Sequence, residues 1–310
     1  MRLKHRTSSL CTLVLSAFAL TSEVRAERPY YDSPSKPVEF NRWDGAVLGL
    51  NVAIGCGMGA IPSMWRGENT SKTLEQCAKG SIGGTLIYAG EKAASYSTTP
   101  GIGWAAHGLV AIGSSVRENV AQDYDLFERV AYDLAFMRLS IGSERSNHGS
   151  IFQAYALLGP FAGIWANLAQ GNSLNWQASL YNGNLIFEAT EEQYFRPNDN
   201  DEQSYGIANV ITIRREGHKY RDGKRADDYH ADQEDLARSL EHEQIHAVMY
   251  REFGSVDVLL EEWEKYNRLK QRFHLSLGGD LGYAAIVGIS TSFPHELRAS
   301  EWNASNLDHK

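Results

Sequence analysis

Positive charge is scarce in this sequence. Its 310 residues carry 30 lysines and arginines against 38 aspartates and glutamates, a formal net charge of −8 at pH 7. No stretch interleaves basic residues with aromatics. Because a surface that binds nucleic acid must neutralise phosphates with clustered Lys and Arg, the composition excludes nucleic acid as the partner.

Cysteine is scarce as well. Of the three cysteines, Cys11 falls in the N-terminal segment, which leaves Cys56 and Cys77 for the folded chain. Their spacing is not that of a cysteine metal site. In an oxidising compartment the two can form a disulfide, and a free buried thiol is the alternative; the sequence leaves both open.

Residues 1–26 have the three parts of a secretory signal. A positive start (residues 1–6) precedes an apolar stretch from Leu10 to Leu20 that is too short to span a bilayer, and Val24-Arg25-Ala26 offers a cleavage site. Removal takes away four basic residues and one acidic residue, which leaves a net charge of −11. We therefore expect an exported protein (periplasmic, outer-envelope or extracellular), with an uncleaved N-terminal anchor as the alternative because Arg25 lies at the site.

Charge is missing altogether over the 21 residues from Gly45 to Trp65. Gly45, Gly49, Ala53 and Gly57 recur every four residues, which places small side chains on one helical face. The pattern predicts that another helix backbone approaches this face closely. Gly80 and Gly84 repeat the same spacing.

An uncharged segment of this length can cross a membrane or fill a protein interior. The many glycines lower the drive for insertion, and Pro62 interrupts the segment near its end. We therefore favour close-packed helices with peripheral membrane contact through residues 45–116 over membrane spans.

The middle of the chain has strand-like patterns. Leu134 to Ile141, Gln177 to Ala189 and Ile207 to Arg214 are rich in β-branched and aromatic residues. Between them, Ile151 to Gln170 is uncharged and contains Gly159-Pro160, so we expect either a kinked buried helix or a second membrane-contacting element.

The most specific motif is His-Glu-Gln-Ile-His at residues 242–246, the HExxH zinc signature. A helix is expected from about Asp232 to Phe253, and on it His242 and His246 lie on one face and can reach one metal ion. Glu243 then points to the open side of the metal, where it can take a proton from bound water. The alternative is a coincidental pair of histidines on a charged, solvated helix.

A third protein ligand is needed, and the best candidate is Glu296. Residues 294–300 read Pro-His-Glu-Leu-Arg-Ala-Ser and resemble the Glu-aromatic-x-Ala-Asp element of gluzincins in the HtpX and CAAX-prenyl-protease group. The resemblance implies that Glu296 completes the zinc shell and that Ala299 packs against the motif helix. Ser300 stands where the group has an Asp that supports a ligating histidine, and the resemblance covers only about residues 232–303.

Acidic residues on the next helix are the alternative ligands. Glu261, Glu262 and Glu264 lie about where thermolysin-like enzymes place theirs, but the surrounding sequence lacks that family's pattern. A solvated helix face is the better interpretation of this cluster.

Together these features predict an α+β fold. We expect a signal peptide (1–26), an extended lead-in (27–44), a glycine-rich helical region (45–130), and a zincin-like metal-binding domain with a small antiparallel sheet and HExxH-bearing helices (131–310). The predicted function is a zinc-dependent peptidase, with Zn²⁺ bound by His242, His246 and Glu296 and with Glu243 as the catalytic base; its substrate is a peptide or protein. The alternative is a non-catalytic envelope protein in which zinc is structural.

Overall fold

The structure is a computed structural model of the chain. It describes residues 40, 43–99, 101–189, 204–214, 216–221, 224–230, 233–261, 264–277 and 280–281. The predicted signal peptide and most of the predicted lead-in lie outside the described residues. So do residues 282–310, which include the predicted ligand Glu296.

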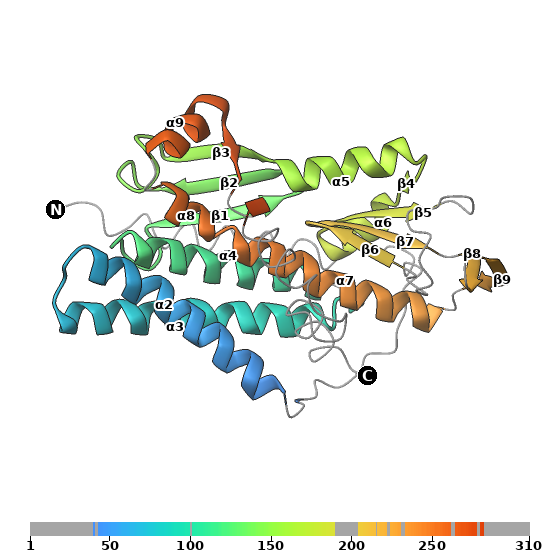
Figure 1. Ribbon diagram of the computed structural model, residues 1–310, viewed down its shortest axis with the longest axis horizontal. Helices are drawn as coiled ribbons and strands as arrows, with labels where there is room; N and C mark the ends of the chain where they lie inside the picture. The colour runs from blue at the N-terminus through green and yellow to red at the C-terminus, as the bar shows by residue number, and fades with distance from the viewer. Residues whose placement is uncertain are drawn as a thin grey trace.

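Long helices form one side of the molecule. They are α2 (Asp44–Trp65), α3 (Thr70–Ala94), α4 (Ile102–Ala121) and α7 (Gln233–Phe253). In Figure 1, α2, α3 and α4 lie side by side and α7 runs beside them towards the opposite end of the molecule. The side chain of Asn69 caps α3 by accepting a hydrogen bond from the backbone N–H of Lys72, which satisfies one of the free donors of the first turn.

Glycines let α2 and α3 touch backbone to backbone. A Cβ at Gly55 would overlap the carbonyl oxygen of Gly80, and a Cβ at Gly84 would overlap that of Asn51. The close approach expected at Gly80 and Gly84 is therefore confirmed. Absence of a side chain at these positions is what lets the two helix axes approach so closely.

The predicted contact face of α2 is wrong. Gly45 and Gly49 are exposed and have no neighbouring atom within 4 Å of an added Cβ. The face that packs carries Asn51, Gly55 and Gly59 instead. Both sets repeat every four residues, so spacing alone does not distinguish the packed face from the open one.

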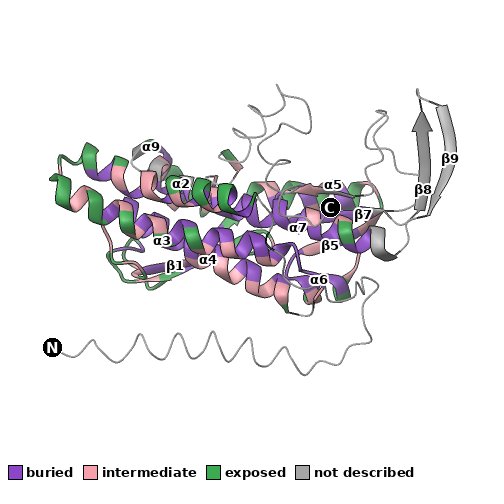
Figure 2. Cartoon of the chain, turned by 90° about the horizontal axis from the view of Figure 1, so that it is seen from below, coloured by how far each residue is buried: buried purple, intermediate pink, exposed green. Residues whose placement is uncertain are grey.

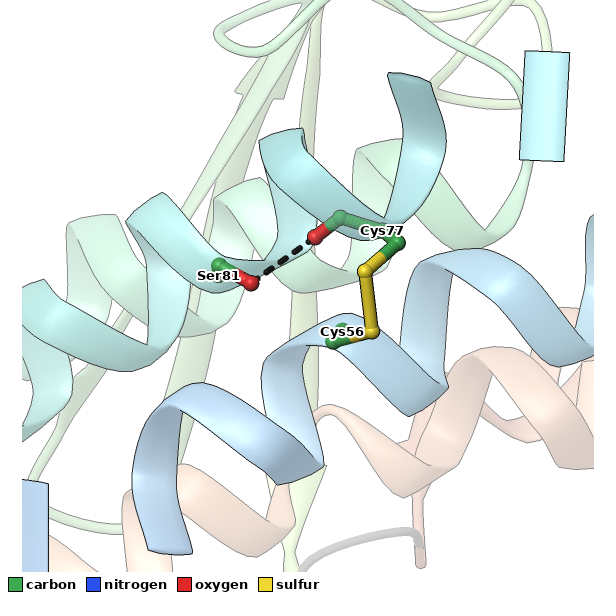
Figure 3. Close-up of a disulfide and its surroundings, with 3 residues drawn as sticks. All are labelled: Cys56, Cys77 and Ser81. Atoms are coloured by element: carbon green, nitrogen blue, oxygen red, sulfur yellow. Dashed lines mark hydrogen bonds between the residues drawn. A yellow bond between two sulfur atoms is a disulfide. The ribbon is translucent and has the colours of Figure 1, made fainter. Parts of the chain in front are cut away.

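A disulfide joins α2 to α3 beside this glycine contact. Cys56 follows Gly55 on α2, and Cys77 follows Gln76 on α3, whose carbonyl oxygen meets Gly59. Figure 3 shows the bond bridging the two helices. Of the two states that the sequence leaves open, the structure has the bonded one. The pair is consistent with an oxidising compartment.

Two four-stranded sheets cover the helices (Figure 1). Sheet A has the order β1-β2-β3-β10 and sheet B the order β4-β5-β7-β6. The strands of sheet A are Arg129–Leu134, Met137–Gly142, Phe152–Leu157 and Leu275–Ser276; those of sheet B, in the same spatial sense, are Ser173–Leu174, Leu185–Ala189, Val210–Arg214 and Ser204–Ile207. A separate hairpin pairs β8 (Glu216–Arg221) with β9 (Lys224–His230).

The expected small antiparallel sheet is thus replaced by mixed sheets. The strands β3 and β10 pair in parallel, as do β5 and β7, while their other neighbours are antiparallel. The coarse expectation of an α+β fold is confirmed. The parallel pairs join strands that are distant in the chain, and a local pattern of alternation does not report such pairings.

Three predicted elements have different forms in the structure. Leu134 to Ile141 is the β1–β2 hairpin, which turns at Ala135 with a φ of 51°. The first half of the strand predicted from Gln177 is the helix α6 (Trp176–Asn182), because the side chain of Asn175 accepts from the Ala178 N–H and caps it. The segment 151–170 is β3 followed by α5 (Leu158–Ala169), with Pro160 in the first turn, where a missing N–H is tolerated.

The helix that the sequence predicts after the motif helix is described as α8 (Val256–Glu261) and α9 (Glu264–Phe273). Charged residues pack beneath it. Lys270 on α9 donates to Asp257 and, at 2.5 Å, to Glu261 on α8, and all three side chains are buried. Burial raises the pKa of both carboxyls, but Lys270 outweighs it and holds the pKa of each below its ordinary value.

Further ion pairs tie the bundle to its covering elements. Arg117 on α4 donates to Glu252 on α7, and Glu118 accepts from Arg129 and Arg138 of sheet A. All five side chains are buried. Figure 2 shows how much of α4 and α7 is buried, whereas α2 has a long exposed side.

Candidate functional site

The helix α7 holds the HExxH motif in the interior. Ile245, Val248 and Met249 pack with residues of α2, α3 and α4, among them Ile87 and Val110. On another side, Leu236, Leu240 and Ala247 pack against Ile186, Ile211 and Ile213 of sheet B. Two apolar contacts therefore fix the rotation of α7, and the alternative of a solvated helix does not fit this burial.

The two histidines of the motif face each other. Their Nε2 atoms are 3.1 Å apart, and the ring centroids are 4.7 Å apart. Two imidazole nitrogens bound to one tetrahedral zinc ion, at about 2.0–2.1 Å each, are separated by about 3.3 Å. The 3.1 Å between His242 and His246 is a hydrogen-bond distance, and it is close to the separation that a shared metal ion requires. His246 is buried and His242 is half-buried.

Glu243 is buried between α7 and the β6 strand of sheet B. A Cβ added to Gly206 would lie 2.8 Å from Oε2 of Glu243, so glycine at this position makes room for the carboxylate. The β6 strand is the last in sheet B among the described residues. The carboxylate of the motif is therefore adjacent to a sheet edge.

The single strand predicted from Ile207 to Arg214 is corrected by the structure. It is a hairpin that turns at Ala208, with a φ of 57°, and Asn209. Ile207 ends β6 and Ile213 lies in β7, the interior neighbour of β6. The edge beside the motif is thus formed by residues 204–207.

A polar network holds the side of α7 opposite the histidines. Asn184 donates to Oε1 of Gln244 at 2.6 Å, and Arg251 donates to Oδ1 of Asn184. His107 of α4 is fully buried nearby, and burial, with the positive charge of Arg251, lowers the pKa of His107 well below its ordinary value. His107 is therefore neutral at pH 7 and belongs to the packing of α7.

The described downstream carboxylates are all held by other partners. Glu252 binds Arg117, and Glu261 binds Lys270 and accepts from Gln122 at 2.8 Å. Asp280 accepts from the Tyr250 hydroxyl at 2.6 Å and from the Gly159 N–H at 2.8 Å. The expected solvated face around Glu261 is instead a buried ion pair.

The third metal ligand is not placed by the described part of the chain. Within that part, no cluster of three or more His, Cys, Asp or Glu side chains is arranged to hold a metal ion. Glu262, Glu296 and Glu301 lie outside the described residues, and the side chain of Glu264 is not described. The structure thus brings together the rings of His242 and His246, places the Glu243 carboxylate against Gly206, and leaves Glu296 a prediction.

Two contacts made by residues of α7 have little or no signal in the sequence. Gly206 lies 36 positions before His242 in a loop-like sequence, so only the fold relates it to Glu243. Tyr250 does have a weak signal, since it lies two helical turns beyond His242. Its partner Asp280 follows Gly278-Gly279, a pair that marks a turn but not the place to which the chain returns. The ring of His274 lies 6.3 Å from that of Tyr155 in sheet A.

Comparison with known proteins gives no relative from which a role can be transferred. No family model, curated protein or solved structure matches the chain. The functional assignment must therefore come from the residues themselves.

Proposed function

We propose that this protein is an exported zinc-dependent peptidase with its catalytic centre on α7. The observation that carries the proposal is the 3.1 Å approach of the His242 and His246 Nε2 atoms, on a helix whose rotation is fixed by two apolar contacts. Two nitrogens at this distance suit a single zinc ion. A bound zinc ion would acidify a water molecule and polarise the scissile carbonyl.

Glu243 is assigned the role of general base. As the neighbour of His242 on the helix, it points about 100° away from that histidine rather than at the same metal face. Its carboxylate lies against Gly206 at the sheet edge, where it can accept a proton from water and pass it to a leaving amine. A structural metal site has no use for such a base.

The β6 edge suggests how a peptide would be held. An edge strand carries backbone N–H and C=O groups that an extended peptide can pair with, and specificity then comes from alternate side chains. Because Gly206 adjoins Glu243, a peptide added along residues 204–207 would pass close to the proposed base. The substrate class is therefore an unstructured or extended polypeptide segment.

Glu296 remains our proposed third ligand, on the strength of the resemblance of residues 294–300. A carboxylate completes the His₂Glu set that catalytic zinc sites use, with the fourth position left for water. Export is proposed from residues 1–26, and the Cys56–Cys77 disulfide is consistent with it.

A structural metal site is the second candidate. It is favoured by the position of α7, which contacts both the helical bundle and sheet B, so a metal that steadies this helix would support both contacts. Ser300, in place of a supporting Asp, favours the same conclusion.

Metal content of the mature chain (residues 27–310) tests the site. We expect about one zinc per chain, lost in His246→Ala and kept in His274→Ala. His274 is an exposed histidine in the turn before β10 and serves as the matched control. Glu296→Gln should weaken zinc binding, because an amide is a poorer ligand. The metal site is ruled out if the wild-type protein contains no zinc and if a chelator leaves its melting temperature unchanged.

Hydrolysis of casein or a peptide library separates the two candidates. Glu243→Gln nearly keeps the shape of the side chain but cannot accept a proton, so it should retain zinc and stability and lose hydrolysis by at least a hundredfold. Gly206→Ala should also reduce hydrolysis, because its Cβ would crowd Oε2 of Glu243. Equal activity in wild type and Glu243→Gln would leave the structural role as the function of the metal.

A further inference from the structure

The open side of α2 has the reverse of the usual polarity. Its buried side includes the polar residues Asp44, Asn51 and Ser63. Its exposed side carries large apolar residues, namely Leu50, Ile54, Ile61, Met64 and Trp65. A surface helix of a water-soluble protein normally shows the opposite arrangement, with polar residues towards solvent. Figure 2 shows the exposed residues along α2.

The ends of this apolar stripe carry tryptophans. Trp43 precedes the first residue of α2 and Trp65 is its last, and both are exposed. The 22 residues of the helix extend over about 33 Å, at about 1.5 Å per residue. Tryptophan prefers the membrane–water interface, where its apolar ring and its N–H group are both satisfied.

Ordinary explanations of an apolar helix do not apply to α2. It is the one described helix that is long and apolar enough to cross a membrane, and most of its apolar length is not buried. A core helix of a soluble protein would be mostly buried. A signal sequence lies at the extreme N-terminus, whereas α2 begins at Asp44 and is cross-linked to α3 through Cys56.

We infer that α2 docks on a lipid bilayer, with its axis along the membrane plane and its open side in the interface. The stripe formed by Leu50, Ile54, Ile61, Met64 and Trp65 supplies the inserted side chains. This docking surface is independent of the proposed metal site. Such in-plane helices bury one face about 5–10 Å into the headgroup and acyl boundary.

The neighbouring helix argues for docking rather than spanning. The glycine contacts and the disulfide hold α3 along α2, so Lys72, Glu75 and Lys79 of α3 lie beside the half of α2 that runs from its middle to Trp65. If α2 crossed the bilayer, these side chains would enter hydrocarbon at about 2.5–3.5 kcal/mol for each charge near the centre. Insertion of the open side of α2 alone avoids that penalty.

The net charge of the α2–α3 helix pair identifies the kind of lipid. Residues 44–94 contain four acidic and four basic residues, so their net charge is zero. Attraction to anionic lipid is therefore absent, and burial of apolar surface provides the affinity. Binding should need only zwitterionic lipid and should change little with salt.

Flotation of the mature chain with phosphatidylcholine vesicles tests the docking surface. Ile54→Glu with Ile61→Glu should lower binding at least tenfold. Leu269→Glu on α9 is the matched control, because Leu269 and Ile54 are both 41% exposed apolar residues and α9 lies across the molecule from α2 in Figure 1. The control should bind like wild type, and all three proteins should melt at similar temperatures.

Several results would overturn the inference. These are unchanged vesicle binding of the double variant, an equal loss of vesicle binding in Leu269→Glu, or a wild-type chain that does not float with the vesicles. A wild-type dimer that the double variant dissociates in the absence of vesicles would assign the surface to a second copy instead. Bound protein that resists extraction at alkaline pH would show a spanning helix and contradict docking in the plane.

Discussion

The α2–α3 crossing and the contact between α7 and sheet B are both buried, but different atoms make them. At the crossing, Gly55 meets the backbone of Gly80, and no side chain separates the helices. Between α7 and sheet B, branched side chains such as Leu240 and Ile211 interdigitate. An added atom at the α2–α3 crossing therefore causes a steric clash. At the contact between α7 and sheet B, the neighbouring side chains can shift to fill part of the space that a deleted methyl group leaves.

Charge distinguishes the same two regions. Ion pairs run through the helical bundle and its junctions, including Arg117–Glu252, whereas the core between α7 and sheet B is aliphatic. A buried pair is destabilising when one partner is removed, because the remaining charge is left without compensation. The two regions should respond differently to substitution and to pH.

The largest effect is expected at the junction of α4 and α7. Arg117→Met removes the cation that pairs with buried Glu252 and also donates to the Asn51 backbone oxygen at 2.8 Å. We expect a loss of about 3–5 kcal/mol in the free energy of unfolding, measured by urea denaturation. The double variant Arg117→Met/Glu252→Met should recover part of this loss; if it is less stable than the single variant, the uncompensated charge is not the cause.

The glycine crossing should respond next most strongly. In Gly55→Ala, the new Cβ would overlap the Gly80 carbonyl, so we expect a loss of about 1–3 kcal/mol. Gly49→Ala on the open side of the same helix is the matched control; it should be stabilising by about 0.5–1 kcal/mol through helix propensity. Thermal melts of both variants show whether each change raises or lowers stability. Losses of equal size would contradict the assignment of Gly55 to the packed face of α2 and Gly49 to the open face.

Acid should weaken the packing around His107. Its pKa is depressed in the folded chain by burial and by Arg251, so the unfolded chain binds a proton below about pH 6.5 that the folded chain excludes. Stability from this residue is complete above that pH and falls by about 1.4 kcal/mol per pH unit below it. Unfolding of wild type and His107→Gln between pH 7 and 5 should show the shallower slope in the variant, and parallel slopes would contradict a buried neutral imidazole.

The smallest effect is expected in the aliphatic core. Ile211→Val removes one methyl group from the contact between β7 and α7 and should lower stability by about 1 kcal/mol. Chemical denaturation measures the change. A loss as large as that of Gly55→Ala would remove the contrast between the two regions.

The sequence predicts the elements that depend on local signals. The motif helix was expected from about Asp232 to Phe253 and is described from Gln233 to Phe253, because Gly254 ends it and acidic residues begin it. The facing histidines follow from the i, i+4 spacing on that helix. Periodicity in a long helix is a strong local signal.

The errors arise where distant residues decide the structure. The pattern of Gly45 and Gly49 has the same period as that of Gly55 and Gly59, and only the position of α3 selects the second set. Likewise, Gln177 to Tyr181 has strand-like residues, but the cap at Asn175 begins a helix there. From its sequence neighbours Glu261 is interpreted as a solvated acid, and only the fold shows that Lys270 pairs with it.

The Cys56–Cys77 disulfide also bears on the order in which the chain folds. Its cysteines are only 21 positions apart and both belong to the first quarter of the sequence. During synthesis from the N-terminus, the α2–α3 hairpin can therefore be covalently closed before residues 242–246 have been made. Closing a loop of this length lowers the conformational entropy of the unfolded chain, which stabilises the folded state by about 3 kcal/mol. The histidines then join a bundle whose first two helices are already fixed.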